Sequence, residues 1–226
     1  MFDLGPQPIQ VVTEMPELSA ALWDLSANGE LVTWSISDGG NGSYIGRTDW
    51  TTGVTTRYSL PDEVENRDWE AMVPGVSTAE GASSIWILDV GDNKAKRKDV
   101  QFYEIEIPAL TLKRTIVGSY AAGPRNVEGA LAATSSLGVP GAYLIEKTGS
   151  NRGARMAWVD LSPEAGSVQQ LPDQAVLTGI PFSITDAPWD SSGKGALFLT
   201  YFGIYACQEF SEGEGNCVTP GRPKRV

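Results

Sequence analysis

Short runs in which apolar and polar residues alternate recur along most of the chain. Examples are ELVTWSIS, VQFYEIEI and GALFLTYFG, and turn sequences such as SDGGNG, GDNKAK and TGSNRG separate them. Alternation of period two, with many β-branched and aromatic residues, is typical of half-buried β-strands. No segment shows the apolar period of an α-helix over about ten residues, so the sequence predicts an all-β protein. The predicted strands are 30–37, 43–50, 54–60, 83–91, 100–107, 112–120, 141–147, 154–161 and 195–203.

A weak repeat of roughly fifty to sixty residues groups these strands into similar units. Each unit opens with a strand of small residues and continues with an apolar strand that ends in polar residues. The opening segments are ELSAALWD (17–24), DWEAMVPG (68–75), NVEGALAA (126–133) and ITDAPWDS (184–191). Repeats of this length are typical of propeller blades, whose first strand lines a crowded central channel. We therefore predict a β-propeller with four to five recognisable blades.

The repeat also sets the expected domain organisation. We expect one propeller domain over residues 1–226, since closed all-β architectures reach this length as a single unit. The blade-like units cover about 15–60, 65–120, 124–180 and 182–226. The segment PIQVVTE (8–14) reads as a further strand that would pair with the last blade and close the ring, because an open sheet edge invites pairing with other chains.

An acidic residue stands at the same place in three of the opening strands. Glu70, Glu128 and Asp186 each precede a small residue, and Ser19 takes this place in the first unit. The repeat aims these side chains at a common axis, where carboxylates repel one another unless a cation lies among them. Calcium is the expected ion because it accepts many oxygen ligands in irregular geometry, and magnesium is the alternative. The same acids would also serve to bond backbone amides of neighbouring blades and fix their register.

Further candidates lie close to these acids in the sequence. Asp68 shares the opening strand of the second unit, and Asp92 and Asn93 follow the next strand, where Gly-Asp-Asn is also a turn signal in its own right. Arg97 would form an ion pair with one of the acids or bind a substrate anion. Lys147 would orient a phosphoryl or carboxylate group, or lie exposed at the end of a strand.

Composition excludes several kinds of chemistry and partner. The chain has no histidine, which excludes Ser-His-Asp and Cys-His catalysis, histidine-ligated zinc and histidine general bases. The net charge of -11, with KAKRK (94–98) as the one basic cluster, argues against a nucleic-acid partner. No apolar run reaches the roughly twenty residues of a membrane span. Cys207 and Cys217 flank a polar segment and are compatible with a disulfide or with free thiols.

The order of motifs along the chain resembles that of a known group of proteins. Bacterial, often exported, six-bladed propellers have the motifs DWED, GDN, AEAL and TDA in this order. This chain has similar segments in the same order: NRDWEAM, DVGDNKAKR, VEGAL with YLIEK, and ITDAPWDSSGKG with LTYFGIY. That group looks like a distant relative of phytase-like, gluconolactonase-like and diisopropylfluorophosphatase-like propellers. In those, channel calcium held by Glu, Asp and Asn activates phosphoester or lactone hydrolysis. The resemblance covers most of residues 15–206 and implies a shortened relative, because the last two blades have no counterpart.

The resemblance implies a set of functional residues. SISDGG (35–40) departs from the group's His-Asn-Asp-Ser-Gly pattern, so no ligand is carried over from the first blade. The implied calcium ligands are Asp68, Glu70, Asp92, Asn93, Glu128 and Asp186. The implied catalytic carboxylates are Asp186, Glu70 and Glu128, and the implied contacts of a small-molecule substrate are Arg97 and Lys147.

Three functions are compatible with these patterns. The first is a calcium-dependent hydrolase of phosphoesters or lactones that acts at the central channel. The alternative is a non-catalytic propeller that binds a partner or carbohydrate and keeps only a structural metal. A third is an assembly in which an open propeller edge pairs with a second copy as a homodimer. The resemblance implies a secreted or periplasmic location, although Met1-Phe2-Asp3 does not begin a signal peptide, which leaves a cytoplasmic location open.

Overall fold

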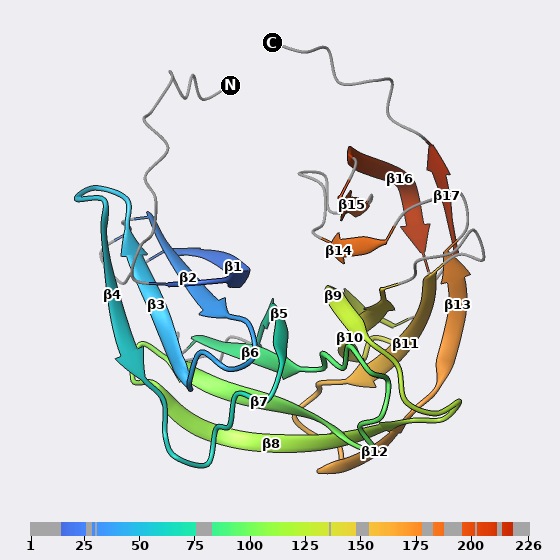
Figure 1. Ribbon diagram of the computed structural model, residues 1–226, viewed down its shortest axis with the longest axis horizontal. Helices are drawn as coiled ribbons and strands as arrows, with labels where there is room; N and C mark the ends of the chain where they lie inside the picture. Colours follow the sequence, from blue (N-terminus) through green and yellow to red (C-terminus); the bar gives the residue numbers. More distant parts are fainter. Residues whose placement is uncertain are drawn as a thin grey trace.

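Four sheets stand side by side around a common axis in the computed structural model (Figure 1). The structure describes residues 15–25, 29, 31–75, 83–135, 137–147, 154–177, 183–187, 196–201, 203–211 and 214–218. This part of the chain contains no α-helix, and so no helix that would cross a membrane. The prediction of an all-β propeller is confirmed, with four blades among the described residues.

Within each blade the first strand in the sequence lies nearest the axis and the others follow outward. The first blade contains β1 (Leu18–Leu25), β2 (Leu31–Ser37), β3 (Tyr44–Asp49) and β4 (Val54–Ser59). The second contains β5 (Trp69–Pro74), β6 (Ser83–Asp89), β7 (Val100–Ile107) and β8 (Thr111–Tyr120). The third contains β9 (Val127–Thr134), β10 (Pro140–Glu146), β11 (Ala154–Asp160) and β13 (Asp173–Leu177). The fourth contains β14 (Ile184–Asp186), β15 (Ala196–Thr200), β16 (Gly203–Ser211) and β17 (Glu214–Val218).

One strand leaves its own blade and joins the neighbouring one. β12 (Val168–Leu171) lies between β11 and β13 in the sequence but pairs in parallel with β8 at the outer edge of the second blade. Leu171 of this strand is buried in the apolar cluster between the second and third blades. The exchange therefore ties these two blades together by backbone hydrogen bonds as well as by side-chain packing.

The inner strands follow one another around the axis in chain order. β1 contacts β5, β5 contacts β9, and β9 contacts β14. Figure 1 shows them as an arc with β1 and β14 at its two ends. The strand predicted at 8–14 to close the ring lies outside the described residues.

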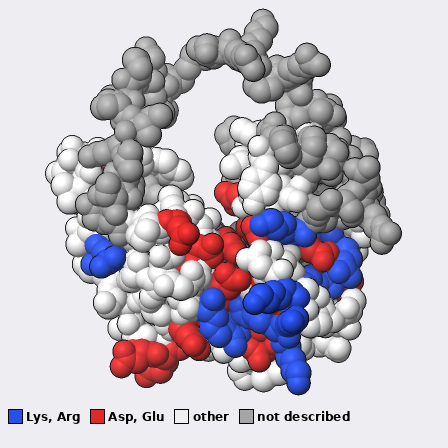
Figure 2. Space-filling model, in the orientation of Figure 1, with Lys and Arg blue, Asp and Glu red and all other residues white. Residues whose placement is uncertain are grey.

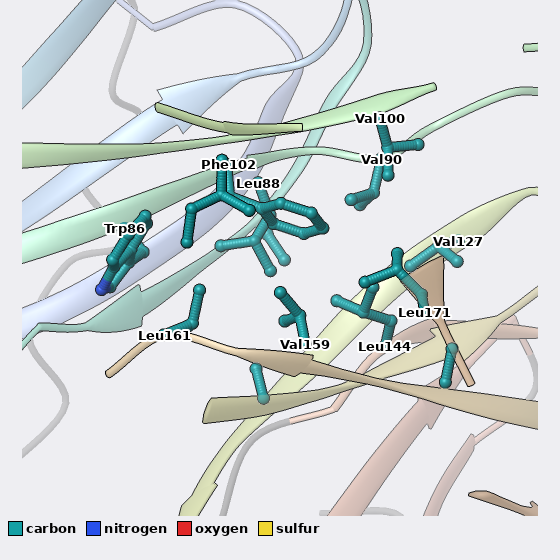
Figure 3. Packing of buried hydrophobic residues seen from close by; sticks show 14 of the residues in the cluster. Trp86, Leu88, Val90, Val100, Phe102, Val127, Leu144, Val159, Leu161 and Leu171 are labelled. Carbon is teal, nitrogen blue, oxygen red and sulfur yellow. The ribbon is translucent and has the colours of Figure 1, made fainter. Parts of the chain in front are cut away.

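The core consists of three apolar layers between successive blades rather than one central cluster. The first layer joins Trp34 and Ile36 of β2 to Trp69 and Ile87 of the second blade. In the second layer, Leu88 and Phe102 of the second blade point toward Leu144 and Val159 of the third (Figure 3). The third layer joins β9, β10 and β11 to β14 and β15 and contains Leu131, Ile145, Met156, Ile184 and Phe198. Each blade is therefore held mainly by burial of apolar area against its neighbours.

The two end faces of the arc carry exposed apolar side chains. Trp23 and Trp50 of the first blade are 62% and 51% exposed, and their ring centroids lie 5.0 Å apart. Trp50 Nε1 donates a hydrogen bond to Thr33 Oγ1, and Thr33 alternates with Trp34, which packs toward the second blade. The tryptophan pair therefore lies on the face that points away from that blade. The homodimer through an open edge stays a prediction.

Cys207 and Cys217 lie opposite each other in the pairing of β16 with β17. Their side chains are outside the described part of the structure, so the alternative of a disulfide or free thiols stays open.

A pair of tryptophan substitutions tests how the blades are held. Trp69 has no exposed surface in the layer between the first two blades, so Trp69→Ala should lower the free energy of unfolding by about 3–5 kcal/mol. Trp23→Ala, on an exposed face, is the matched control and should cost less than about 1 kcal/mol. Urea unfolding measures both. Equal losses in the two variants would contradict the assignment of the apolar layers.

Candidate metal centre

The innermost strand of every blade carries an irregularity at the same place. The register between its first two strands shifts by one residue in each blade, and the extra residues are Ser19, Glu70, Glu128 and Thr185. A bulge leaves its extra residue out of the ladder and re-aims that side chain, which is how an inner strand can direct a polar group to the channel. The alignment made from the sequence fits this register in three blades. In the fourth it is wrong by one residue, because Thr185 and not Asp186 takes the bulge position.

Three carboxylates meet at the mouth of the channel. Asp38 follows β2, Asp68 precedes β5, and Glu70 occupies the bulge of β5. One oxygen of each lies within 4.8 Å of the others, so these three residues form what we call the acid cluster. Figure 2 shows acidic side chains gathered toward the centre of the molecule. The acid cluster joins the first blade to the second, since Asp38 comes from one and the other two residues come from the next.

The acid cluster differs from Asp89 and Glu104, two other buried acids, in its lack of a cationic partner. Among the described residues no Lys or Arg lies within ion-pair distance of its carboxylates. By contrast, Asp89 pairs with Arg67 at 3.1 Å and Arg97 at 2.8 Å, and Glu104 likewise pairs with two cations. Glu70 is only 8% exposed, and its one hydrogen bond in this part of the chain comes from Ser19 Oγ at 3.5 Å. Buried carboxylates without a partner are costly, so this site calls for protons or a bound cation.

The pKa values of the acid cluster reflect this environment. Burial, reinforced by the charges of Glu128, Asp38 and Asp68, raises the pKa of Glu70 to about 9, and Lys147 opposes the shift. Burial, with a hydrogen bond shared with Asp38, raises the pKa of Asp68 to about 7. Near neutral pH the metal-free cluster therefore retains protons, and a cation that binds there must displace them.

Asp89 and Arg97 hold the segment that carries the acid cluster. The Asp68 backbone N–H donates to Asp89 Oδ1 at 2.8 Å. Arg97 donates to both carboxylate oxygens of Asp89, at 3.1 and 2.8 Å, and to the Gly91 carbonyl at 2.7 Å. Arg97 therefore forms an ion pair, but its partner is Asp89, which was not among the candidate acids, and not Glu70 or Asp92. These bonds commit the guanidinium, so its geometry does not favour contact with a substrate anion.

Gly91 permits close approach of the backbone to the acid cluster. A Cβ atom at this position would lie 2.5 Å from Asp68 Cγ and 2.7 Å from Glu70 Oε1. These distances are shorter than van der Waals contact, so a side chain here would displace both carboxylates. The glycine of the GDN motif is thus explained by space at the site.

Asp92 and Asn93 lie next to the acid cluster but outside it. Asp92 Oδ2 accepts the backbone N–H groups of Lys96 at 2.5 Å and Arg97 at 2.6 Å. Asn93 is exposed, and its Oδ1 accepts a hydrogen bond from Asn126. This geometry favours the turn interpretation of the pair, with Asp92 shaping the loop that follows the cluster.

Glu128 reaches the channel but has its own partners. Glu128 Oε1 accepts hydrogen bonds from Lys147 Nζ at 2.9 Å and Asn126 Nδ2 at 2.8 Å. The Lys147 ammonium also lies over the ring of Tyr201, 5.6 Å from its centroid. Glu128 and Lys147 therefore form an ion pair on the third blade, whose inner strand β9 contacts β5, the strand that carries Glu70.

Asp186 stands apart from these groups. Burial raises its pKa, its Oδ1 accepts the Ala187 backbone N–H at 2.7 Å, and no other acid contributes to the shift. In the register it takes the place of Ala20 and Ala71, which pack toward the following blade. The structure thus does not bring Asp186 to the acid cluster, and a catalytic role for it stays a prediction.

Asp38 is the member of the acid cluster that the sequence did not identify. Ser37 pairs with Leu18 and Glu146 pairs with Val127, so Asp38 and Lys147 are equivalent residues directly after their strands. The polar residues at the end of each second strand, which the repeat placed at the channel mouth, could have identified Asp38. It was not chosen because SISDGG departs from the pattern of the group that the sequence resembles.

The acid cluster fits calcium better than other common ions. Its donors are oxygens alone, from three carboxylates that can bind through one or both oxygens, and no histidine or cysteine sulfur takes part. This donor set suits Ca²⁺ or Mg²⁺ rather than zinc or copper, and the unequal surroundings of the three acids suit the irregular coordination of calcium.

Comparison with known proteins supports the fold. No family model matches the chain, and no curated protein matches it. The chain is similar to a crystal structure of a putative 6-phosphogluconolactonase from Bacteroides uniformis ATCC 8492, with a TM-score of 0.51 and 12% identity over 90% of this chain and 56% of that one. For hydrazine synthase from Kuenenia stuttgartiensis the TM-score is 0.47 and the identity 14%, over 95% of this chain and 53% of that one. For the Dos1 propeller the TM-score is 0.40 and the identity 10%, over 90% of this chain and 48% of that one. The chain spans about half the length of these structures, and the similarity to the first of them supports the propeller fold.

The raised pKa values predict how the metal-free protein responds to pH. Folded Glu70 and Asp68 hold protons more tightly than their unfolded counterparts, so their contribution to the free energy of unfolding should be fully present below about pH 4 and be lost as pH rises to about 9. Urea unfolding with a chelator at several pH values measures this slope.

Two variants identify the source of the slope. Glu70→Gln removes the strongest contribution and should flatten the pH dependence, whereas Glu164→Gln, at an exposed position, should leave it unchanged. The same slope in wild type and Glu70→Gln would show that another group is responsible.

Proposed function

We propose that this chain is a calcium-dependent hydrolase of phosphoesters or lactones that acts at the mouth of the central channel. The observation that carries the proposal is the acid cluster, whose three carboxylates lack a cationic partner among the described residues. A lactonase-like propeller among the similar solved structures hints at a hydrolase, although at 12% identity it supports the fold alone.

The residues divide into those that bind and those that move a proton. Asp38, Asp68 and Glu70 would hold the cation. When bound, calcium supplies a Lewis acid that polarises a phosphoryl or carbonyl oxygen. Glu128 Oε1 is committed to Lys147 and Asn126, which orients the carboxylate and leaves Oε2 to accept a proton from water. The water oxygen would then bond to phosphorus or carbon as the ester bond breaks, and the leaving oxygen would take up the proton held by Glu128 Oε2, which restores the carboxylate.

One observation favours the alternative of a binding propeller with a structural metal. The acid cluster combines Asp38 of the first blade with Asp68 and Glu70 of the second, so a cation would link two blades whether or not the channel is catalytic. Under this alternative a chelator lowers stability, while changes at Glu128 leave ligand binding intact.

Two glutamate substitutions separate the alternatives. Glu70→Gln should lower calcium affinity at least about tenfold and abolish hydrolysis, because it removes a ligand charge. Glu128→Gln should keep calcium binding and lower kcat by about 10²–10⁴, the usual contribution of a general base. Glu164→Gln is the exposed control for both. Calcium calorimetry and a panel of phosphotriesters, phosphodiesters and lactones provide the measurements.

Lack of hydrolysis by the wild-type protein across that panel, with excess calcium, would refute the hydrolase. If the chelator still lowered the thermal midpoint of wild type but not of Glu70→Gln, the alternative of a binding propeller with a structural metal would be supported.

A further inference from the structure

Among eight positions that the repeat makes equivalent, one carries a positive side chain, and one, Val90, is buried in the apolar layer between the second and third blades. Four are the bulge residues, of which two are acidic. The other four directly follow the second strand of each blade, and they are Asp38, Val90, Lys147 and Tyr201. Lys147 on the third blade is the cation of this set, and the acid cluster lies on the first and second blades. The mouth thus has a cation-binding side and an ammonium side.

We propose that Lys147 makes the mouth selective for ligands that carry a phosphate oxyanion, such as phosphodiesters, over neutral esters and lactones. The part of the proposal that concerns catalysis rests on the proposed function. The part that concerns binding depends only on a calcium-loaded site.

The Lys147 ammonium is placed to contact a ligand. Its side chain is 25% exposed, it pairs with Glu128 Oε1 at 2.9 Å, and it lies over the exposed ring of Tyr201. An ammonium group has three N–H donors, and one ion pair with a ring contact leaves a donor for an incoming oxygen. Its partner Glu128 occupies the bulge of β9, and β9 contacts β5, where Glu70 occupies the equivalent bulge. A ligand held at the acid cluster would therefore have the blade that carries Lys147 as its neighbour.

Other cations near the mouth are less suited to this role. The guanidinium of Arg97 is bonded to Asp89 and the Gly91 carbonyl. Lys94, Lys96 and Lys98 are exposed on the loop that Asp92 shapes, and Figure 2 shows basic side chains beside the acidic ones. Such exposed lysines raise the local concentration of anions without fixing them.

The charge balance explains why one residue would decide selectivity. Three carboxylates with a divalent cation leave about one negative charge, and the Glu128–Lys147 pair adds none. Removal of the ammonium would leave Glu128 unpaired and turn the third-blade side negative as well. An oxyanion would then be repelled from both sides, whereas a neutral ester would lose little.

The test uses the full chain loaded with calcium and dimethyl phosphate as the probe anion. Lys147→Met keeps the length and apolar stem of the side chain, and Lys147→Arg keeps the charge. Lys113→Met is the matched control, since Lys113 pairs with Glu104 at 3.1 Å away from the mouth. Calorimetry should show that dimethyl phosphate binds to wild type and to Lys113→Met with similar affinity. Its affinity for Lys147→Met should be at least tenfold lower, and its affinity for Lys147→Arg should lie between the two. Calcium affinity should not fall in any of these variants, because none of them changes a residue of the acid cluster.

Kinetics then separate this proposal from the proposed function. Lys147→Met should raise KM for bis(4-nitrophenyl) phosphate at least tenfold and change KM for neutral 4-nitrophenyl acetate and δ-valerolactone by less than about threefold. Any loss of kcat should be alike for both classes of substrate, because Lys147 also orients Glu128. If wild type hydrolyses esters but Lys147→Met changes KM for anionic and neutral substrates alike, the subsite is wrong and the hydrolase stands. If wild type hydrolyses nothing yet binds dimethyl phosphate through Lys147, the hydrolase is wrong and the subsite stands. Failure of wild type to bind dimethyl phosphate overturns the subsite.

Discussion

The convergence of the inner strands on one axis is the constraint on which the rest of this structure depends. Where β9 approaches β14, a Cβ atom on Gly129 would lie 3.2–3.3 Å from the backbone of Asp186 and Ala187, so little beyond a hydrogen atom fits. Ala20 and Ala71 take the equivalent places in the first two blades. Crowding favours small side chains at this place in the ladder of the first three blades, whereas Asp186 takes it in the fourth. The bulge beside each of these residues provides a direction in which a larger polar side chain can leave the strand toward the channel.

The polar side chains that the bulges direct toward the channel differ in their partners. On the third blade Glu128 has an ammonium partner, whereas on the second blade Glu70 has none in the described structure. The acids of the second blade are joined by Asp38 of the first, and the bonds from Asp89 and Arg97 fix the segment that holds them. A divalent cation at this place would offset most of the charge of the acid cluster and add a link between two blades that apolar packing and hydrogen bonds, such as that from Ser19 Oγ to the Trp69 carbonyl, already hold together. Metal binding, protonation and stability are therefore expected to be coupled in this protein.

The fold was accessible from the sequence because period-two alternation and the repeat of small-residue strands are local signals. The same repeat identified Glu70 and Glu128, which the bulges direct into the channel. The prediction that aligned Asp186 with them was off by one residue, because a bulge changes the register without a mark in the sequence. Asp38 was missed because its proximity to Asp68 depends on how two blades meet. Asp92 and Asn93 combined a turn signal with a ligand signal, and only the observed bonds of Asp92 distinguish the two.

The central claim is that Asp38, Asp68 and Glu70 together hold a cation, and a crystal structure of the protein grown with calcium tests it most directly. The account predicts anomalous density at the channel mouth, with carboxylate oxygens of all three residues within about 2.3–2.6 Å of the ion. Density bound elsewhere, or an acid cluster without an ion at millimolar calcium, would contradict it.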